Sequence, residues 1–290
     1  MNTTAAQFPY PWQRCKVIHL VRHGQAMHNV EGDKDRNALL SPHLFDAQLS
    51  PLGLQQVCKL RKEVHARGLF KKIELVVTSP LHRTMQTAIG VFGNESSADE
   101  GNTDNFSAKP GGLDCPQIMA VELCRDRLGV RPCDMRRKVS ECEALFPSID
   151  FSMMDGEDDS MWNPDIREPE EEIAARMVLF MNWLWTRPEQ DIVIVSHGII
   201  LQQILKVLGN DCHQAVSSAL CQRFDNCELR SVVIVDKTSI KVQSNIFYRG
   251  NKENSKGTYL HTQPRAVDST LCSSRDVAKQ QHVLREEVSN

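Results

Sequence analysis

The amino-acid sequence predicts an α/β fold in three layers, with helices covering both faces of a mostly parallel, doubly wound sheet. Segments rich in Val and Ile alternate along the chain with segments whose apolar residues recur at helical spacing. The longest apolar runs, such as residues 192–195 and 232–235, have the length of single strands. Hydrophobic residues make up 41% of the chain and charged residues 24%, which is close to the average for globular proteins.

The pattern predicts strands and helices in alternation. Helix 52–66 follows Ser50-Pro51, a capping residue and a first-turn proline, and helix 168–186 has acidic residues after Pro169. The expected strands are 16–21, 73–78, 118–122, 191–195 and 231–236, and the expected helices are 52–66, 81–92, 136–145, 168–186 and 198–208.

One domain is expected over residues 1–250. Within it, residues 93–114 are rich in Gly, Ser, Asn and Asp and predict a mobile surface loop. Residues 251–290 are polar without a sustained period, which predicts a disordered tail.

No apolar run approaches the roughly 20 residues of a membrane span, and residues 1–14 have no signal-peptide pattern, so we expect no membrane association and a cytoplasmic protein.

The charge balance argues against nucleic acid as a partner. The chain has 34 Lys and Arg against 37 Asp and Glu, a net charge of −3, so it has no broad basic field and any anion must bind locally.

The Cys and His residues of the region 212–227 lack a C-x-x-C or H-x-x-x-H pair, which would place two metal ligands on one turn, so no metal site is expected. The residues concerned are Cys212, His213, Cys221 and Cys227.

Two predicted strands end in a histidine that is followed by glycine. The first strand runs into Arg22-His23-Gly24, and the fourth runs into Ser196-His197-Gly198. In a doubly wound sheet, ligands bind at the carboxyl ends of the strands, so both histidines would face one crevice if their strands are neighbours. Gly24 would let the backbone turn sharply and approach a ligand.

The second predicted strand passes through Pro80 into a helix that begins near Arg83. Arg83 would lie in the first turn, beside backbone N–H groups that already favour an anion. Together with Arg22, it could form a cradle of two guanidinium groups, whose planar forks match phosphate oxygens.

These segments resemble a known family. LVRHGQAMHN, LSPLGLQQV, SPLHRTMQTA and VSHG are similar to motifs of the histidine phosphatase superfamily, also called phosphoglycerate mutase-like, in the family's order over about residues 16–236. VRPCDMRRKVSE and NCELRSVVIVD are similar to plant and fungal phosphoglycerate mutase-like proteins. The resemblance implies a phosphohistidine mechanism without a metal or other cofactor, with His23 as the nucleophile. It implies phosphoryl-binding roles for Arg22, Arg83 and His197, and substrate contacts from Gly24, Gln25 and Asn29.

The general acid is where the sequence departs from the family's pattern. Relatives place a glutamate after the third strand, shortly before a glycine; here Glu122 has the expected side chain, but Asp126 aligns better with Gly129. Alternation along a strand would put residues 122, 124 and 126 on one face, so either carboxyl group could point inward. We favour Asp126 and keep Glu122 as the alternative.

The expected function is hydrolysis of a small phosphomonoester, such as a sugar phosphate or a similar metabolite. Mutase-type phosphoryl transfer is an alternative, but the sequence shows no obvious second basic cluster for a second phosphate. Residues 155–165 are acidic and, if they cover the site, would repel polyanions. A phosphate-binding module with weak catalysis is the other alternative, and the oligomeric state is left open.

Overall fold

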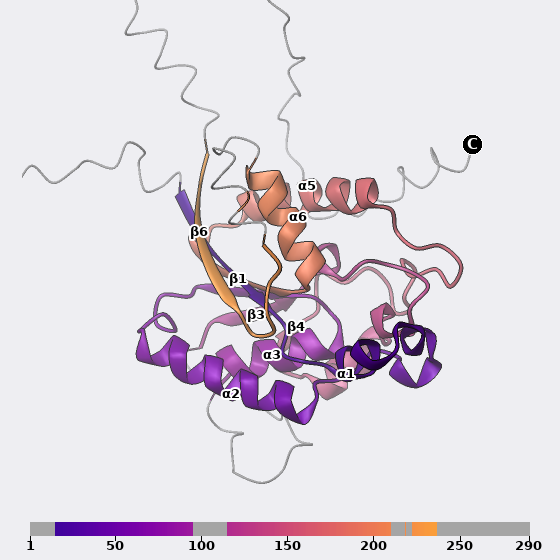
Figure 1. Cartoon of the computed structure of the whole chain (residues 1–290). Helices are drawn as coiled ribbons and strands as arrows, with labels where there is room; N and C mark the ends of the chain where they lie inside the picture. The colour runs from indigo at the N-terminus through magenta and orange to yellow at the C-terminus, as the bar shows by residue number, and fades with distance from the viewer. Residues whose placement is uncertain (1–14, 95–114, 210–217, 219–221, 237–290) are drawn as a thin grey trace, which may run out of the picture. The chain divides into compact units, whose positions relative to one another are not determined.

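A computed structural model describes residues 15–94, 115–209, 218 and 222–236 (Figure 1). The chain divides into two units, and nearly all of the described residues lie in Lys16–Ile234. This unit is built on a six-stranded sheet with the order β4-β3-β2-β5-β1-β6. The strands are β1 Cys15–Arg22, β2 Leu75–Thr78, β3 Gln117–Ala120, β4 Ile149–Asp150, β5 Asp191–Ser196 and β6 Leu229–Val235.

The sheet is mostly parallel, as predicted. The pairs β1–β5, β5–β2, β2–β3 and β3–β4 are all parallel, and neighbouring strands that are distant in sequence are joined by crossovers. The helices are α1 Met27–Lys34, α2 Pro51–Ala66, α3 His82–Phe92, α4 Val139–Leu145, α5 Glu170–Thr186 and α6 Gly198–Leu208. The predicted α/β class is therefore confirmed.

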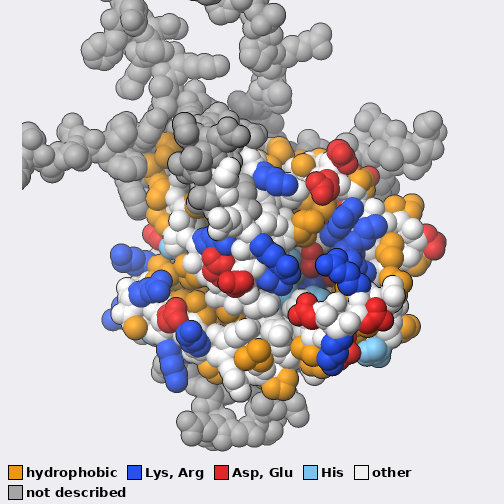
Figure 2. All heavy atoms as spheres, viewed as in Figure 1, with side chains coloured by type: hydrophobic (Ala, Val, Ile, Leu, Met, Phe, Trp, Pro, Cys, Tyr) orange, Lys and Arg blue, Asp and Glu red, His pale blue; other side chains and the backbone are white. Residues whose placement is uncertain are grey.

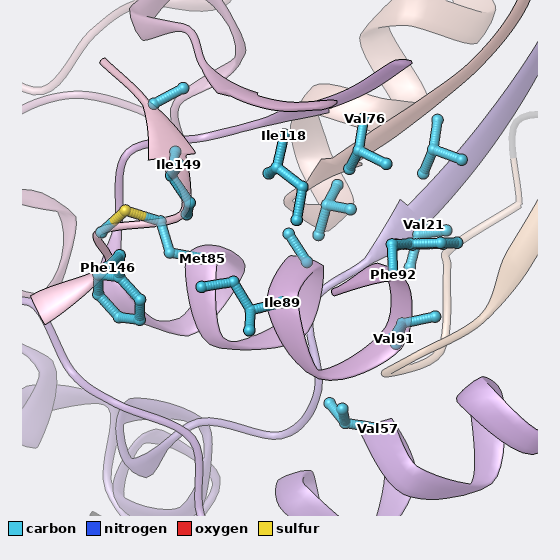
Figure 3. Packing of buried hydrophobic residues seen from close by; sticks show 14 of the residues in the cluster. Val21, Val57, Val76, Met85, Ile89, Val91, Phe92, Ile118, Phe146 and Ile149 are labelled. Atoms are coloured by element: carbon cyan, nitrogen blue, oxygen red, sulfur yellow. The ribbon is translucent and has the colours of Figure 1, made fainter. Parts of the chain in front are cut away.

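Helices cover both faces of the sheet. α2 and α3 lie together on one face, and α5 and α6 lie together on the other (Figure 1). Between α3 and the sheet, Met85 and Ile89 pack in one apolar cluster with the strand residues Val76 and Ile118, and Val57 joins the cluster from α2 (Figure 3). Burial on both faces explains the continuous apolar run 192–195 of β5, whereas the run 232–235 of β6 is only partly buried.

Some elements were not predicted, and others were predicted with different bounds. Helix α1 has no apolar stripe, and β4 has only two residues. The helix expected over 136–145 begins at Val139. The strand expected over 118–122 ends at Ala120, and a 3-10 helix follows over Glu122–Cys124.

Several other expectations concern residues that the structure does not describe. The predicted loop 93–114 lies outside the described residues except for residues 93 and 94, and the predicted tail 251–290 and the domain boundary at residue 250 lie outside them entirely. Cys212, His213 and Cys221 also lie outside them. Within the described part of the chain, no helix is long and apolar enough to cross a bilayer.

The loop after β1 packs tightly against the beginning of α2. Ser50 caps this helix by accepting a hydrogen bond from the Gly53 N–H at 3.1 Å, as the Ser50-Pro51 pair predicted. A Cβ atom on Gly24 would lie 2.8 Å from the Gly53 carbonyl oxygen, and a Cβ atom on Gly53 would overlap the Gln25 carbonyl. Both glycines therefore allow an approach of two backbones that a side chain would prevent, and this approach fixes the loop that follows His23.

Candidate active site

The carboxyl ends of three neighbouring strands meet at one place. Arg22 at the end of β1 is aligned with Ser196 at the end of β5, so His23 and His197 leave adjacent strands at the same level. Their ring centroids are 5.2 Å apart. The end of β2 is aligned with β5, and the following Ser79 places its Oγ 2.9 Å from His197 Nε2. The structure thus brings together the two histidines that the sequence placed at strand ends.

His23 is held in one tautomer by its own loop. Its Nδ1 lies 2.6 Å from the Gly24 carbonyl oxygen, which can only accept a hydrogen bond, so Nδ1 carries the proton and Nε2 has a lone pair. Burial lowers the pKa of His23 well below its usual value, and the nearby cations Arg83 and Arg22 lower it further. A neutral imidazole with a free Nε2 is the form that can act as a nucleophile.

Arg83 is fully buried in the first turn of α3. Its Nη1 donates to the Cys133 carbonyl at 2.6 Å, and its Nη2 donates to Asp126 Oδ2 and to Asp134 Oδ1, both at 3.1 Å. Its Nε has no hydrogen-bond partner among the described residues. The guanidinium group is therefore fixed on one edge, and one donor is left unused.

Arg22 and His197 lie at the same strand ends as His23. Arg22 is half-buried, its Nη1 donates to the Phe224 carbonyl at 2.7 Å, and its Nε is without a partner in the described parts of the chain. Burial lowers the pKa of His197 well below its usual value, with a further contribution from Arg83. Both arginines thus have an orphaned buried Nε–H, a donor that a phosphate oxygen would satisfy.

The structure separates the two candidate acids. Asp126 lines the pocket, and its Oδ2 lies 3.3 Å from His197 Nδ1 as well as 3.1 Å from Arg83. Glu122 is not among the described residues that line this pocket; it is buried between Arg125 and Arg136 and forms an ion pair with each. The alternation argument fails because the chain leaves the strand before residue 122 and turns through a 3-10 helix.

Two carboxyl groups share Arg83 and influence each other. Burial alone would raise the pKa of Asp126, but Arg83 and the backbone N–H of Arg127 outweigh it and hold the pKa below the usual value. Burial and the nearby Asp126 raise the pKa of Asp134, although Asp134 also forms an ion pair with Arg167 at 2.8 Å. The two carboxyl groups are thus shifted in opposite directions, and the ionised form is favoured more strongly at Asp126 than at Asp134.

The three expected substrate contacts, Gly24, Gln25 and Asn29, do not all face the pocket. Asn29 lines the pocket, and its side chain accepts from the Ala26 N–H at 3.0 Å, which holds the start of α1. Gln25 Oε1 instead accepts from Ser50 Oγ at 2.7 Å, toward α2, and the side chain is not among the described lining residues. Gly24 acts through its backbone, whose N–H donates to Thr87 Oγ1 at 3.1 Å and whose carbonyl holds His23.

One histidine of the site was missed by the sequence analysis. His28 is buried, lines the pocket, and has its ring centroid 5.7 Å from that of His23. Its Nε2 lies 3.0 Å from Asn29 Nδ2, and its Nδ1 has no partner within the described chain. Burial lowers its pKa well below the usual value. The sequence offered no signal for it because α1 lacks an apolar stripe and was not expected to be a helix.

The pocket has a volume of about 390 Å³, the size of a small-molecule site. Its lining includes Arg22, His23 and Asp126, residues of α1 and of the start of α6, and further arginines, whereas the fully buried Arg83 and His197 are not among the described lining residues. Figure 2 shows this face, where basic side chains stand on both sides of a hollow in which part of a histidine is visible. Among the described residues, no three His, Cys, Asp or Glu side chains are placed to hold a metal ion.

Comparison with known proteins identifies the family. Residues 18–98, which include the end of β1 and all of α2 and α3, match the sequence profile of the histidine phosphatase superfamily (branch 1). Phosphoglycerate mutase-like protein 1 of Arabidopsis thaliana is 49% identical over 255 residues, which cover 85% of this chain and 90% of that protein. The chain belongs to the histidine phosphatase superfamily.

A second Arabidopsis thaliana protein, named phosphoglycerate mutase-like protein, is 47% identical over 246 residues, or 81% of this chain and 90% of that protein. The family profile and these two relatives confirm the resemblance stated from the sequence motifs. A solved structure of ecdysone phosphate phosphatase from Bombix mori, in complex with tungstate, matches with a TM-score of 0.49 and 16% identity. That match covers 84% of this chain and 97% of the other.

The buried histidines of this superfamily member predict a loss of stability in acid. Burial lowers the pKa of His23, His28 and His197 well below 6.5, whereas the unfolded chain takes up protons near that pH. Below about pH 6.5 the unfolded state therefore binds more protons, and the free energy of unfolding falls by about 1.4 kcal/mol per pH unit for each histidine. Above that pH these groups contribute no pH dependence.

Urea unfolding from neutral pH down to about pH 5 measures this slope. We expect His28→Gln to reduce the slope by about 1.4 kcal/mol per pH unit. His65→Gln, at an exposed position of α2, controls for the loss of a histidine as such. An unchanged slope in His28→Gln would mean that His28 takes up a proton as readily in the folded chain as in the unfolded one.

Proposed function

We propose that this chain is a phosphatase that hydrolyses a small phosphomonoester through a phosphohistidine on His23. The observation that carries the proposal is the hydrogen bond from His23 Nδ1 to the Gly24 carbonyl, which leaves the Nε2 lone pair available in a pocket lined with cationic groups. The Arabidopsis relatives are named for their likeness to a phosphoglycerate mutase, and the family profile is that of histidine phosphatases. Both are consistent with phosphoryl transfer through histidine.

In the first step, Nε2 of His23 attacks phosphorus and the bond from phosphorus to the ester oxygen breaks. The negative charge of the transition state is spread over the equatorial oxygens, so catalysis depends on fixed donors and cations around them. The orphaned Nε–H groups of Arg22 and Arg83 are such donors, and His197 adds a third nitrogen at the same strand ends. These side chains are already in position in the folded chain before phosphate binds.

Asp126 is placed to give a proton to the leaving alcohol. Arg83 stabilises the charge of Asp126 and so favours its ionised form before a substrate binds. A bound phosphate dianion would interact with the same guanidinium group and would repel the carboxylate. The pKa of Asp126 would therefore rise, and its carboxylate would bind a proton. In the second step, the same carboxylate takes a proton from water, the oxygen of that water attacks phosphorus, and the bond to Nε2 breaks.

The first test of this proposal is turnover of p-nitrophenyl phosphate. We expect His23→Ala to lower kcat/KM by about 10³-fold or more, because the variant has no nucleophile. We also expect vanadate, which mimics the five-coordinate transition state, to inhibit the unmodified protein competitively. His65→Ala on the exposed face of α2 is the matched control. Near-normal hydrolysis by His23→Ala, or no hydrolysis of any phosphomonoester by the unmodified chain, would refute the proposal.

The second test concerns the acid. We expect Asp126→Asn to slow alkyl phosphates by about 10²-fold or more and aryl phosphates much less, because a phenolate leaves with little help from a proton donor. Glu122→Gln is the control: it weakens buried ion pairs with Arg125 and Arg136, so it should lower the melting temperature without this dependence on the leaving group. If only the Glu122 variant shows the dependence, the assignment of Asp126 is wrong.

A further inference from the structure

We propose that Asp134 is a positioning residue for the general acid: it binds the same nitrogen of Arg83 as Asp126 does, and it thereby directs a proton to Asp126 when phosphate binds. This inference rests on the proposed function, because it assigns a role in the same reaction. Asp134 is buried and is not among the described residues that line the pocket. It therefore acts on the reaction only through its neighbours.

One nitrogen of Arg83 serves both carboxyl groups. Nη2 lies 3.1 Å from Asp126 Oδ2 and 3.1 Å from Asp134 Oδ1. Nη1 of the same guanidinium group donates to the Cys133 carbonyl at 2.6 Å, so this edge of Arg83 is turned toward the 3-10 helix that contains Asp134. Two carboxyl groups that share one cation repel each other when both are ionised, so each makes the other easier to protonate.

Asp134 has a second cation beside it. Its Oδ2 accepts a hydrogen bond from Arg167 Nη1 at 2.8 Å. Among the described residues, the only ion-pair partner of Asp126 besides Arg83 is His197, whose Nδ1 lies 3.3 Å from Oδ2. Burial lowers the pKa of His197 well below its usual value, so this imidazole is neutral near pH 7. Asp126 thus depends on Arg83 alone for a full positive charge in contact with it.

Binding of phosphate changes which carboxyl group takes the proton. Before binding, burial and the charge of Asp126 raise the pKa of Asp134, whereas Arg83 holds that of Asp126 low. A phosphate dianion enters the pocket that Asp126 lines, interacts with Arg83, and repels Asp126 more strongly than the more distant Asp134. Asp134 keeps Arg167 and stays ionised, so the proton goes to Asp126.

The carboxyl group of Asp134 is fixed in place. Arg125 Nη2 donates to the Asp134 carbonyl at 2.8 Å, and the Arg125 side chain is itself fully buried. Arg167 Nη1, which binds the carboxyl group, also donates to the Gly129 carbonyl at 2.6 Å. Asp134 is therefore held between Arg83 and Arg167, and its negative charge stays beside Asp126 throughout the reaction.

The other titratable groups around the two carboxyl groups do not add a negative charge. Cys133 Sγ lies 3.5 Å from Asp134 Oδ1, and burial raises the pKa of this thiol, so it is neutral. Histidines and arginines face the pair from the other elements: Arg22 and His23 from the end of β1, His28 from α1, Arg83 from α3, Arg167 from the segment before α5, and His197 from the end of β5. Among these groups, Asp134 is the one whose charge opposes the arginines.

An aspartate in the role of the acid needs such an opposing charge. The unperturbed pKa of aspartic acid is roughly 3.9, against roughly 4.3 for the glutamic acid that relatives place after the third strand. Arg83 lowers the pKa of Asp126 further. A group that protonates a leaving alkoxide works best with a pKa near the working pH, and the charge of Asp134 moves Asp126 in that direction.

The variant Asp134→Asn keeps the shape of the side chain and an acceptor for Arg83, but it removes the charge. We expect kcat for an alkyl phosphate to fall about 10-fold on the alkaline side of its profile, and the alkaline limb to move to lower pH, because Asp126 becomes harder to protonate. The kcat of p-nitrophenyl phosphate should change little, since a phenolate leaves with little help from an acid. Asp165→Asn, at an exposed position, is the matched control for the loss of a carboxylate.

A second substitution separates the effect of charge from a merely structural role. Asp134→Asn combined with Arg167→Gln removes one charge of each sign, so the excess positive charge beside Asp126 is gone. We expect the alkyl-to-aryl ratio of kcat and the alkaline limb to return toward those of the unmodified chain. A structural role predicts a double variant at least as impaired as the single one, because the contact with Gly129 is lost as well. Should Asp134→Asn fail to fold, the double variant still has to show a ratio close to that of the unmodified chain.

The outcomes distinguish this inference from the proposed function. An unchanged alkyl-to-aryl ratio in Asp134→Asn, or no recovery in the double variant, would overturn the role of Asp134 while Asp126→Asn still shows its dependence on the leaving group. If Asp126→Asn shows no such dependence, the acid of the proposed function is wrong, and the role of Asp134 fails with it.

Discussion

The parallel pairing of β1 with β5 aligns Arg22 with Ser196 and thereby sets the positions of the residues that follow both strands. His23 and His197 leave the sheet side by side because of this register, and a shift by one residue would turn one of them to the other face. The site therefore depends first on the burial of two apolar strands, whose side chains fill the space beneath the helices (Figure 3). Packing at the centre of the fold therefore determines where His23 and His197 lie.

Burial also determines the charge state of the site. Desolvation and the nearby guanidinium groups favour neutral imidazoles, while the same arginines keep Asp126 ionised until an anion arrives. The pocket is thus cationic through its arginines, and His23 is its proposed nucleophile. A bound phosphate would satisfy the donors that the folded chain leaves unused, and its charge would prepare Asp126 to release a proton.

The sequence predicted those features that follow from strand order and periodicity. Arg22, His23 and His197 were found because parallel strands present their carboxyl ends at one edge, and Arg83 because a helix begins directly after β2. The sequence favoured Asp126 over Glu122 by its alignment with Gly129 alone, because the 3-10 turn that separates the two side chains has no periodic signal. Asp134 was missed because it reaches Arg83 from a short 3-10 helix between strands, where sequence distance does not indicate position.

The chemical identity of the covalent intermediate tests the central claim most directly. The substrate would carry a radiolabelled phosphoryl group, turnover would be stopped by rapid quenching, and the labelled peptide and nitrogen would be identified. Because Nδ1 is bound to the Gly24 carbonyl, the account predicts a phosphoramidate on Nε2 of His23, stable in alkali and lost in acid. Phosphate on Nδ1, on His197 or on a carboxylate, or no label despite steady turnover, would contradict it.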